Sequence, residues 1–372
     1  MRPRSKPALP TSGSRRTRPV LHRPPATALD VSRIAGVSRS AVSRTFTDGA
    51  SVSPATRKKV LTAAKALKYR PNLFASSLIT RRSYIIGIGL TELDNQHYPL
   101  VLQLLSEECS KFGYRLLLFI THGSKGHEPM VEELLRYHID ALILASSSLS
   151  SALALECRAA GVPVVMFNNV DPASDVTSVA GTNDLGARAI AAFLAAAGHR
   201  RFGYVGGLQG DSTDQERRAG FASQLREQGL QEPVCIAGHF TFDGAANATR
   251  TLLSSKRPPD AIFCVNDHSA LAALQIARVE FGLIPGKDVS IVGFDNVPIA
   301  AWPGFSLTTY SQPTAIMVGR TIELVRQLLE DKDAPCVHEL VRGELMVRGS
   351  TRLPRTGVVK NADGNHIWRP AS

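Results

Sequence analysis

The sequence predicts two structural classes in one chain, a small all-α segment at the N-terminus and a larger α/β body. Three helical patterns follow one another between residues 27 and 71, each begun by a Thr or Ser that can cap a helix. From residue 84 on, short apolar runs alternate with longer helical patterns, an order typical of parallel sheets wound by crossover helices. The length of 372 residues fits two or three domains.

The first two predicted helices lie close together in residues 27–46. Thr27 and Asp30 stand in capping-box positions for the first helix, and Gly36 can end it in the left-handed conformation. Ser38 can cap the second helix. The apolar residues expected to face inward recur at helical spacing, namely Val31, Ile34, Ala35, Val42 and Phe46.

The opposite side of the second helix carries small and basic side chains, namely Arg39, Ser40, Ser43 and Arg44. A short helix of this kind suits the DNA major groove, where its first turn can meet base edges. The alternative is an ordinary helix pair with a solvated basic face. Charge favours DNA, because the first 82 residues hold 18 Lys or Arg and two Asp, or +16, which leaves −5 of the total +11 for the remainder.

A third predicted helix begins with Ser53 as its cap and Pro54 at its first position. The residues that would cover the first two helices are Val60, Ala63, Ala64 and Leu67. This helix ends near residues 69–72, and a short segment then leads into the body.

Residues 1–26 carry seven Arg or Lys and no acid, and they lack the apolar stretch of a secretory signal. We therefore expect a disordered basic extension, which either adds phosphate contacts on DNA or is dispensable. The five cysteines are scattered without a C-x-x-C pair, and no apolar run is long enough to span a bilayer. These features predict a cytoplasmic protein without a disulfide framework or metal site.

The body repeats one pattern twice. In the first half, strands are expected at 84–89, 114–120, 141–145 and 163–167, separated by helices at 99–112, 127–137 and 149–160. In the second half, helices at 184–197, 215–228, 244–255 and 268–281 alternate with strands at 202–206, 234–237, 261–265 and 289–294. Two similar α/β halves predict a cleft between them, with a ligand at the carboxyl ends of the strands.

Polar residues stand just beyond several of these strands, namely His97, Tyr98, Asn168, Asn266, Asp267 and Asp295. A carboxylate and amides that converge on a cleft suit a ligand with paired hydroxyls. The alternative is that Asn and Asp after strands only form turns. Enzymatic motifs are missing from the sequence, since it contains no G-x-S-x-G, no phosphate loop and no metal-spaced His cluster, so we expect no enzyme and no cofactor.

The N-terminal stretch from D-V-S-R-I-A-G-V-S (30–38) to Y-R-P-N-L-F-A-S-S-L (69–78) resembles the DNA-binding headpiece and hinge of the lactose-repressor/galactose-repressor family of bacterial transcriptional regulators. The body carries further segments that resemble this family, such as P-D-A-I-F-C-V-N-D (259–267) and D-V-S-I-V-G-F-D-N (288–296). The resemblance covers roughly residues 27–355.

This resemblance implies an organisation for the chain. A helix-turn-helix headpiece would occupy residues 27–71, a hinge 72–82, a two-lobed body like that of periplasmic binding proteins 83–355, and a tail 356–372. Lobe 1 would comprise about 83–181 and 310–338, and lobe 2 about 182–308 and 340–355. The chain would cross between the lobes three times, near 181–183, 308–310 and 338–340.

The resemblance also implies site residues. DNA contacts would come from Arg39, Ser40, Ser43, Arg44, Asn72, Ser76 and Leu78. Leu78 would enter a minor-groove step, unless it packs onto the body instead. Effector contacts would come from His97, Tyr98, Asn168, Gln215, Arg217, Asn266, Asp295 and Gln312. Gln215 stands where many sugar-responsive relatives have Arg, which changes the ligand that fits.

The function implied is that of a transcriptional repressor that binds a palindromic operator in double-stranded DNA as a homodimer. A small-molecule effector, a sugar or sugar derivative, would bind in the interlobe cleft, and no membrane would be involved. Residues 297–305, with Trp302, resemble the family's dimer contact, although Trp302 could instead line the pocket. The competing function is a soluble carbohydrate-binding protein without a regulatory role, which would have no use for the headpiece.

Overall fold

The computed structural model describes residues 26–47, 49–70, 82–91, 93–120, 128–145, 151–171 and 173–370. The chain divides into two units, Met1–Arg81 and Arg82–Ser372, and each is described by itself. The predicted hinge residues Asn72, Ser76 and Leu78 lie outside the described residues, as does nearly all of the predicted basic extension.

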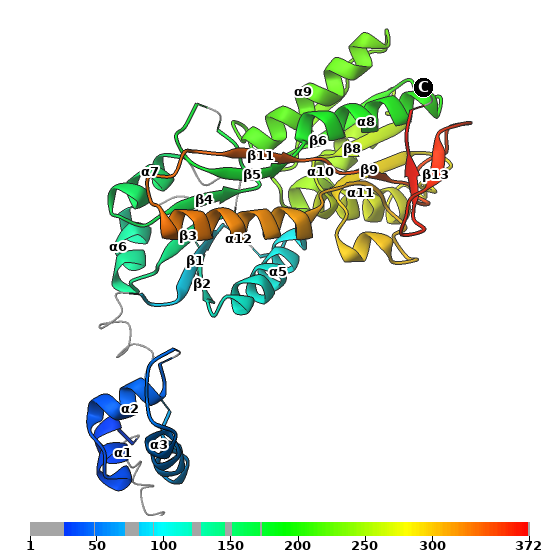
Figure 1. Cartoon of the computed structure of the whole chain (residues 1–372). Coiled ribbons are helices and arrows are strands. Elements are labelled where there is room, and N and C mark those ends of the chain that lie inside the picture. The colour runs from blue at the N-terminus through cyan, green and yellow to red at the C-terminus, as the bar shows by residue number, and fades with distance from the viewer. Residues whose placement is uncertain are drawn as a thin grey trace, which may run out of the picture. The chain divides into compact units, whose positions relative to one another are not determined.

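The N-terminal unit contains three helices, α1 (Ala28–Ala35), α2 (Arg39–Thr45) and α3 (Pro54–Ala66) (Figure 1). Their ends follow the predicted caps. The Thr27 hydroxyl accepts from the N–H of Asp30, and the Asp30 carboxylate accepts from the N–H of Thr27, so the capping box is complete. Ser38 caps α2 in the same way, and Gly36 has a φ of 64° at the end of α1.

The core of this headpiece, by which we mean residues 26–70, is small. Val31, Val42 and Val60 are fully buried and come from the three different helices. The prediction for Ile34 was wrong, because 61% of its surface is exposed. Three short helices enclose little volume. Helix α1 therefore buries Val31 and leaves Ile34, which lies about one turn later, outside the core. The Arg57 guanidinium also donates to the carbonyl of Thr45 and so joins α3 to the end of α2.

Lobe 1 of the second unit is a parallel sheet between two helical layers (Figure 1). The order of its strands is β11-β5-β4-β3-β1-β2. Along the chain its strands are β1 (Ile85–Leu90), β2 (Arg115–Ile120), β3 (Ala141–Leu144), β4 (Val164–Phe167), β5 (Ser178–Gly181) and β11 (His338–Val341). Its helices are α5 (His97–Lys111), α6 (Glu128–Arg136), α7 (Ser151–Ala159) and α12 (Thr314–Glu330).

The two faces of this sheet are covered by different helix pairs, as expected from the alternation of side chains along a strand. Ile143 of β3 packs in a cluster with α5 and α12, whereas its neighbours Leu142 and Leu144 pack in a cluster with α6 and α7. The elements β5, α12 and β11 are not among those that the sequence patterns predict.

Lobe 2 has the same layered construction. Its sheet has the order β13-β14-β12-β10-β9-β8-β6-β7. The strands are β6 (Phe202–Gly206), β7 (Val234–Ala237), β8 (Ala261–Cys264), β9 (Ser290–Asp295), β10 (Thr308–Ser311), β12 (Leu345–Met346), β13 (Val358–Lys360) and β14 (His366–Trp368). The helices are α8 (Asn183–Ala196), α9 (Ser212–Glu227), α10 (Phe242–Leu253), α11 (Asp267–Val279) and the short 3₁₀ helix η1 (Pro298–Ala301).

The parallel cores of the two sheets have the same winding order, β2-β1-β3-β4-β5 and β7-β6-β8-β9-β10. In such sheets ligands bind beyond the carboxyl ends of the strands, near the point where the order reverses. The chain passes from one sheet to the other after Gly181, after Ser311 and after Val341. The second and third of these passages lie a few residues beyond the predicted positions.

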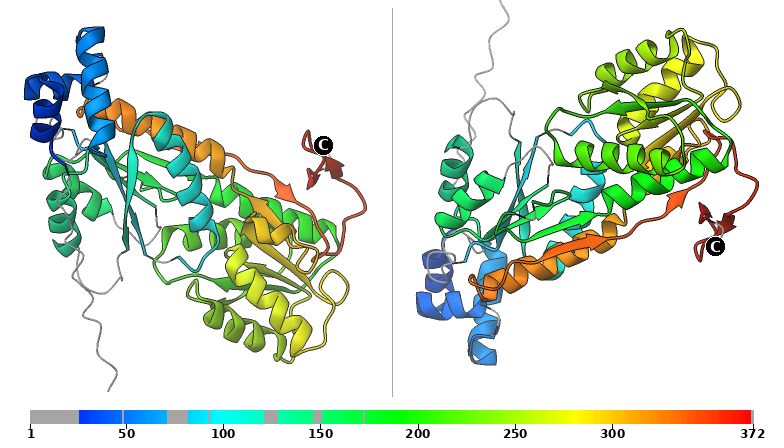
Figure 2. Two further views of the ribbon diagram at one scale, coloured as in Figure 1. Left: turned by 90° about the horizontal axis from the view of Figure 1, so that it is seen from below. Right: turned by 90° about the horizontal axis from the view of Figure 1, so that it is seen from above.

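The C-terminal segment differs from the expected tail. Within residues 356–370 the chain forms the hairpin β13–β14, and β14 pairs with β12, so the sheet of lobe 2 extends to Trp368 (Figure 2). The Trp368 ring lies edge-on to that of Phe193 in α8, with centroids 5.7 Å apart. Burial of these rings gives the hairpin its anchor. Across the described parts of both units, we find no helix with the length and apolar character that crossing a membrane requires.

Candidate functional site

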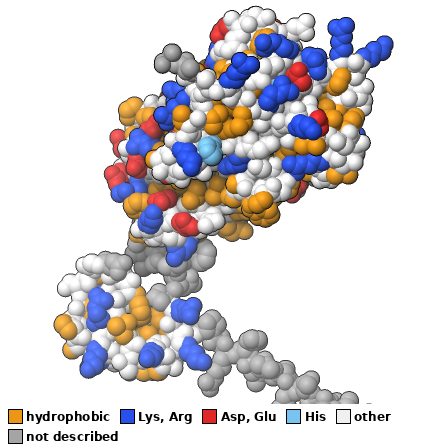
Figure 3. Space-filling model, turned by 90° about the vertical axis from the view of Figure 1, so that its right-hand side faces the viewer, with side chains coloured by type: hydrophobic (Ala, Val, Ile, Leu, Met, Phe, Trp, Pro, Cys, Tyr) orange, Lys and Arg blue, Asp and Glu red, His pale blue; other side chains and the backbone are white. Residues whose placement is uncertain are grey.

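The predicted DNA-contacting residues of the headpiece share one exposed surface. Arg39, Ser40, Ser43 and Arg44 of α2 are all exposed, whereas Val42 on the other side of the helix is buried. Basic side chains are spread over the face of the headpiece seen in Figure 3.

A second candidate site lies in the body, at the carboxyl ends of both sheets. His97, Asn168, Arg217, Asp295 and Gln312 are each at most 7% exposed, and we call these five residues the interlobe polar cluster. Each of His97, Asn168, Arg217 and Gln312 has at least one buried nitrogen or oxygen without a hydrogen-bond partner. His97, Arg217 and Gln312 all lie around Asp295. Buried polar atoms are nearly always paired, so unpaired atoms on three residues around one carboxylate indicate that a ligand or water completes them.

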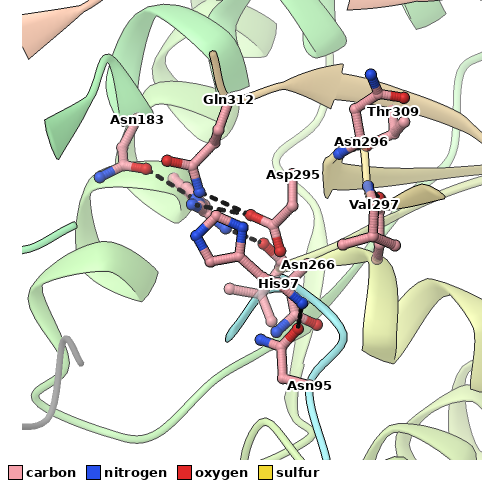
Figure 4. Close-up of polar contacts among 12 residues, drawn as sticks. Asn95, His97, Asn183, Asn266, Asp295, Asn296, Val297, Thr309 and Gln312 are labelled. Atoms are coloured by element: carbon pink, nitrogen blue, oxygen red, sulfur yellow. Dashed lines mark hydrogen bonds and ion pairs between the residues drawn. The ribbon is translucent and has the colours of Figure 1, made fainter. Parts of the chain in front are cut away.

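Lobe 1 contributes His97 and Asn168. The backbone N–H of His97 donates to the Asn95 side chain, which fixes the start of α5 (Figure 4). The imidazole stacks on Phe167 with ring centroids 6.5 Å apart. Burial lowers the pKa of His97, so the imidazole is neutral and offers one donor and one acceptor. Asn168 follows β4 with a φ of 60°, and its side-chain oxygen is unpaired.

Arg217 of α9 is held on several sides within lobe 2. Its Nε donates to Asn183 Oδ1 at 2.9 Å, its Nη1 donates to the Val265 carbonyl at 2.6 Å, and its guanidinium carbon lies 3.6 Å from the centre of the Phe294 ring. The Nη2 atom lies 3.7 Å from Asp295 Oδ1 and is the only nitrogen of this guanidinium described as lacking a hydrogen bond. The side chain is therefore rigid and presents one free corner.

Asp295 is the last residue of β9, and both a side chain and a bend in the backbone hold it in place. Gln312 Nε2, in the second passage between the lobes, donates to Asp295 Oδ1 at 2.7 Å (Figure 4). Asp295 and Asn296 both have positive φ, 122° and 60°, an unfavourable conformation that clusters at functional sites. Arg348 donates to Asn296 Oδ1 and helps to hold this bend in place.

Asp267, the first residue of α11, lies beneath the cluster and accepts from the N–H of Val297 at 2.9 Å. Burial, followed by the charge of Asp295, raises the pKa of Asp267 to about 8. The side chain is therefore largely protonated at neutral pH, which removes one negative charge from the neighbourhood of Asp295.

The structure brings four of the predicted effector residues together, namely His97, Arg217, Asp295 and Gln312. Three others behave differently. Gln215 is exposed on α9, because it lies two residues from Arg217 and successive helix positions turn by about 100°. Tyr98 is packed in the apolar core of lobe 1. Asn266 uses its side-chain oxygen to cap α11 through the N–H of Ser269, which is the turn-forming role considered as the alternative.

Sequence reasoning missed Asn183 and Asp211. Asn183 positions Arg217, and Asp211 caps α9 through Oδ1 while its buried Oδ2 has no partner. The position of Asp211 before a helical pattern would have indicated a cap, but its approach to Arg217 depends on the fold. The Ser212 hydroxyl donates to Asn169 Oδ1 at 2.9 Å and so joins the two lobes beside the cluster.

A Ser-His-Asp arrangement also occurs in lobe 2, away from the cluster. The His199 ring lies 2.8 Å from Ser290 Oγ and 3.3 Å from Asp260 Oδ1. His199 and Ser290 are each 1% exposed, and the N–H of Arg352 donates to the serine oxygen, so no substrate reaches it in this conformation. These contacts join the amino ends of strands and are structural. Among the described residues, no group of three or more His, Cys, Asp or Glu could hold a metal ion.

Two cavities in the described part of the body lie away from the interlobe polar cluster. One of about 420 Å³ lies between α7, β4 and the end of α12, and another of about 620 Å³ lies between α8 and the C-terminal hairpin. Residues of the cluster line neither of these two cavities.

Comparison with known proteins places both units in known families. Residues 27–72 match the family "Bacterial regulatory proteins, lacI family", and residues 191–351 match the "Periplasmic binding protein-like domain". The chain is 31% identical to the HTH-type transcriptional regulator CelR of Thermobifida fusca over 346 residues, which cover 90% of this chain and 99% of the relative. It is 30% identical to the HTH-type transcriptional repressor PurR of Photobacterium profundum, over 88% of this chain and 99% of the relative.

Solved structures agree with these matches. A lac repressor dimer bound to operator and the anti-inducer ONPF has a TM-score of 0.79 and 25% identity, over 88% of this chain and all of that one. A complex of the transcriptional regulator CelR with cellobiose has a TM-score of 0.66 and 29% identity, over the same shares. The relatives compared are transcriptional regulators and not enzymes. With its helix-turn-helix headpiece and two-lobed periplasmic-binding-protein-like body, the chain belongs to the lacI family of bacterial regulatory proteins.

Proposed function

We propose that this protein is a transcriptional repressor that binds a palindromic operator as a homodimer and is controlled by a small ligand between its lobes. One observation carries the proposal. A single chain combines a capped helix-turn-helix, exposing only small and basic side chains along the outer side of α2, with a buried polar cluster whose atoms lack partners. A carbohydrate-binding protein without a regulatory role would need only the second feature.

In this proposal α2 enters the major groove and Arg39, Ser40, Ser43 and Arg44 contact bases and phosphates. An Arg that bridges guanine O6 and N7 contributes about 1–3 kcal/mol of discrimination. The hinge residues Asn72, Ser76 and Leu78 are assigned by family resemblance alone, with Leu78 in a minor-groove step. The domain boundaries proposed are 27–71 for the headpiece and 72–82 for the hinge, with the body extended past 355 to include the C-terminal hairpin.

The interlobe polar cluster is the proposed effector site. His97 and Asn168 belong to lobe 1, Arg217 and Asp295 belong to lobe 2, and Gln312 lies in the second passage between the lobes. A ligand bound to both lobes would stabilise one interlobe arrangement over another, which is the energetic requirement for control of DNA binding. The cellobiose complex of CelR supports a carbohydrate as the effector.

Homodimerisation is proposed through the surface around Trp302. Trp302 is 58% exposed, Val279 at the end of α11 is 77% exposed and Ile284 is 54% exposed. Arg278 donates to the carbonyl of Phe305, which joins α11 to the loop that carries Trp302. Exposed apolar side chains over adjoining segments are typical of protein interfaces. We further propose that the protein has no enzymatic activity and acts in the cytoplasm, where the DNA is.

The test measures binding of the purified full-length protein to a DNA duplex from upstream of its own gene, with fluorescence anisotropy as the readout. We expect affinity for this duplex to exceed affinity for random sequence by at least 10³-fold at physiological salt. Arg39→Ala should reduce this ratio, whereas Arg33→Ala, an exposed Arg on α1, should leave it unchanged. The upstream duplexes tested should include every palindromic segment of the region. Equal affinity for these duplexes and for random sequence would contradict the proposal.

A further inference from the structure

The C-terminal hairpin, β13–β14, adds two strands to one edge of the lobe 2 sheet. Strand β14 pairs with β12 and places Trp368 opposite Leu345. Trp368 is 8% exposed, and its indole N–H donates to the Thr356 carbonyl at 3.3 Å. Since β12 begins directly after the third passage between the lobes, its pairing with β14 brings the folded hairpin to the end of this passage.

Glu344, in the third passage, joins the passage to the hairpin. Its carboxylate accepts from Arg369 Nη2 at 2.8 Å and from Asn361 Nδ2 at 3.2 Å. These two hydrogen bonds, first that from Arg369, lower the pKa of Glu344, so the carboxylate is ionised at neutral pH. Asn361 follows β13 and Arg369 follows β14, so the passage is held from both strands of the hairpin.

The three passages are also joined to one another through their backbones. The N–H of Thr182, in the first passage, donates at 3.2 Å to the carbonyl of Val341, where the third passage begins. The N–H of Ser311, where the second passage begins, donates at 2.7 Å to the carbonyl of Glu344 in the third. The residue that the hairpin holds by its side chain therefore holds the second passage by its backbone.

Tyr310, near the end of β10, adds a side-chain contact among all three passages. Its hydroxyl donates to the Gly343 carbonyl at 3.0 Å, accepts from the Gly343 N–H at 3.1 Å and lies 3.3 Å from Thr182 Oγ1. A Cβ at position 343 would collide with the Ser311 carbonyl oxygen, so glycine is required for the second and third passages to approach this closely. The passages thus form one hydrogen-bonded bundle.

A movement of one lobe against the other must be absorbed by the backbone of these passages, because they are the covalent connections between the two sheets. Hydrogen bonds within the bundle oppose any movement that changes the positions of the passages relative to one another. We propose that the C-terminal hairpin is a brace on this hinge, attached through Glu344, and that it restrains the movement of one lobe against the other. The brace contains none of the five residues of the interlobe polar cluster.

The test measures hydrogen–deuterium exchange by mass spectrometry on the full-length protein without DNA. The reporters are the backbone amides of Thr182, Ser311 and Gly343, because each donates to an atom of another passage. Strand β8, in the middle of the lobe 2 sheet, reports on the stability of the lobe as a whole.

Two variants release the brace. Glu344→Ala removes the carboxylate and leaves the backbone carbonyl that accepts from Ser311. Arg369→Ala removes one of the two donors, whose side chain is 67% exposed, and it remains informative if Glu344→Ala does not fold. The control is Glu232→Ala, which breaks another exposed Arg–Glu ion pair of lobe 2, that with Arg226 at the end of α9.

We expect the three reporter amides to exchange about 3- to 10-fold faster in Glu344→Ala, and by a smaller factor in Arg369→Ala, because brief opening of the bundle becomes more frequent. Exchange in β8 should keep its natural rate in all three variants, and Glu232→Ala should leave the reporters unchanged. Reporter amides that keep their natural rate in the folded variants would overturn the inference. Equal acceleration of the reporters and of β8 would also overturn it, because general destabilisation would then explain the change.

Tyr310→Phe provides a second measurement from inside the bundle. This variant keeps the ring that packs on Phe294, with centroids 5.0 Å apart, and removes only the hydroxyl. We expect faster exchange at Gly343 while β14 keeps its natural rate, since the hairpin remains attached. An unchanged rate at Gly343 would overturn the role of the hydroxyl. Exchange concerns the body alone, so absence of operator binding by the same preparations would contradict the regulatory function and not the brace.

Discussion

Asp267→Asn should make the stability of the protein less dependent on pH. The folded protein raises the pKa of Asp267 from an ordinary value of 3.8 to about 8, chiefly by burial and then by the charge of Asp295. Between these two values the folded state retains a proton that the unfolded state has released. The contribution of Asp267 to stability is therefore fully present below about pH 4 and is lost as the pH rises toward 8.

The size of the effect follows from linkage. One retained proton lowers the free energy of unfolding by about 1.4 kcal/mol for each pH unit, or about 3 kcal/mol between pH 5 and pH 7. The variant lacks this proton, and its amide oxygen can still accept from the N–H of Val297. Burial lowers the pKa of His97 and of His199 in the natural protein and in the variant alike. These histidines make stability depend on pH in the direction opposite to Asp267, because stability is lost as the pH falls below about 6.5. These contributions cancel when the two proteins are compared.

The assay is thermal unfolding of the natural protein and the variant at pH 5, 6, 7 and 8 without ligand. We expect the melting temperature of Asp267→Asn, relative to the natural protein, to rise by roughly 5 °C or more between pH 5 and pH 7. Asp243→Asn, which removes an exposed carboxylate, should show no such trend. A difference between Asp267→Asn and the natural protein that stays constant over this range would refute the argument that Asp267 is held protonated.

Three further predictions concern the proposed sites. Asp295→Ala should abolish the response to the ligand while operator binding persists, since the unpaired ligand hydroxyls cost about 1–3 kcal/mol, and a normal ligand titration would contradict the assignment. Arg44→Ala should weaken operator binding by about 1–3 kcal/mol in anisotropy assays but affect random DNA less, and an equal loss on both would reduce Arg44 to a phosphate contact. Trp302→Glu should convert the dimer to a monomer in analytical ultracentrifugation, whereas Leu353→Glu, at a similarly exposed apolar residue, should not; an intact dimer would place the interface elsewhere.

The local structure of the headpiece could be predicted from the sequence because it depends on neighbouring residues. Thr27 and Asp30 form a capping box from a spacing of three residues, and Ser38 and Ser53 cap the next two helices as expected. The alternating strands and helices of the body were predictable for the same reason, since a period of two or of 3.6 is a property of the backbone. Ile34 has the correct helical spacing, but whether it is covered depended on how closely three helices pack.

The polar residues of the body were predictable in type and not in arrangement. Parallel winding places the carboxyl ends of the strands at one edge, so residues after strands could be nominated from the sequence, as His97, Asn168 and Asp295 were. Helical geometry alone would have separated Gln215 from Arg217, because residues two positions apart point in nearly opposite directions.

Only the tertiary structure decided which of these residues act on one another. Asn183 meets Arg217 across 34 positions of sequence, and Gln312 meets Asp295 across 17. The same packing distinguishes Asn266, whose oxygen caps a helix, from Gln312, whose oxygen remains unpaired. The sequence by itself determined the helix-turn-helix, the α/β body and the family. The charge balance around Arg217 was decided by the fold, because burial and distance, which set the strength of an electrostatic interaction, depend on residues brought together from distant parts of the chain.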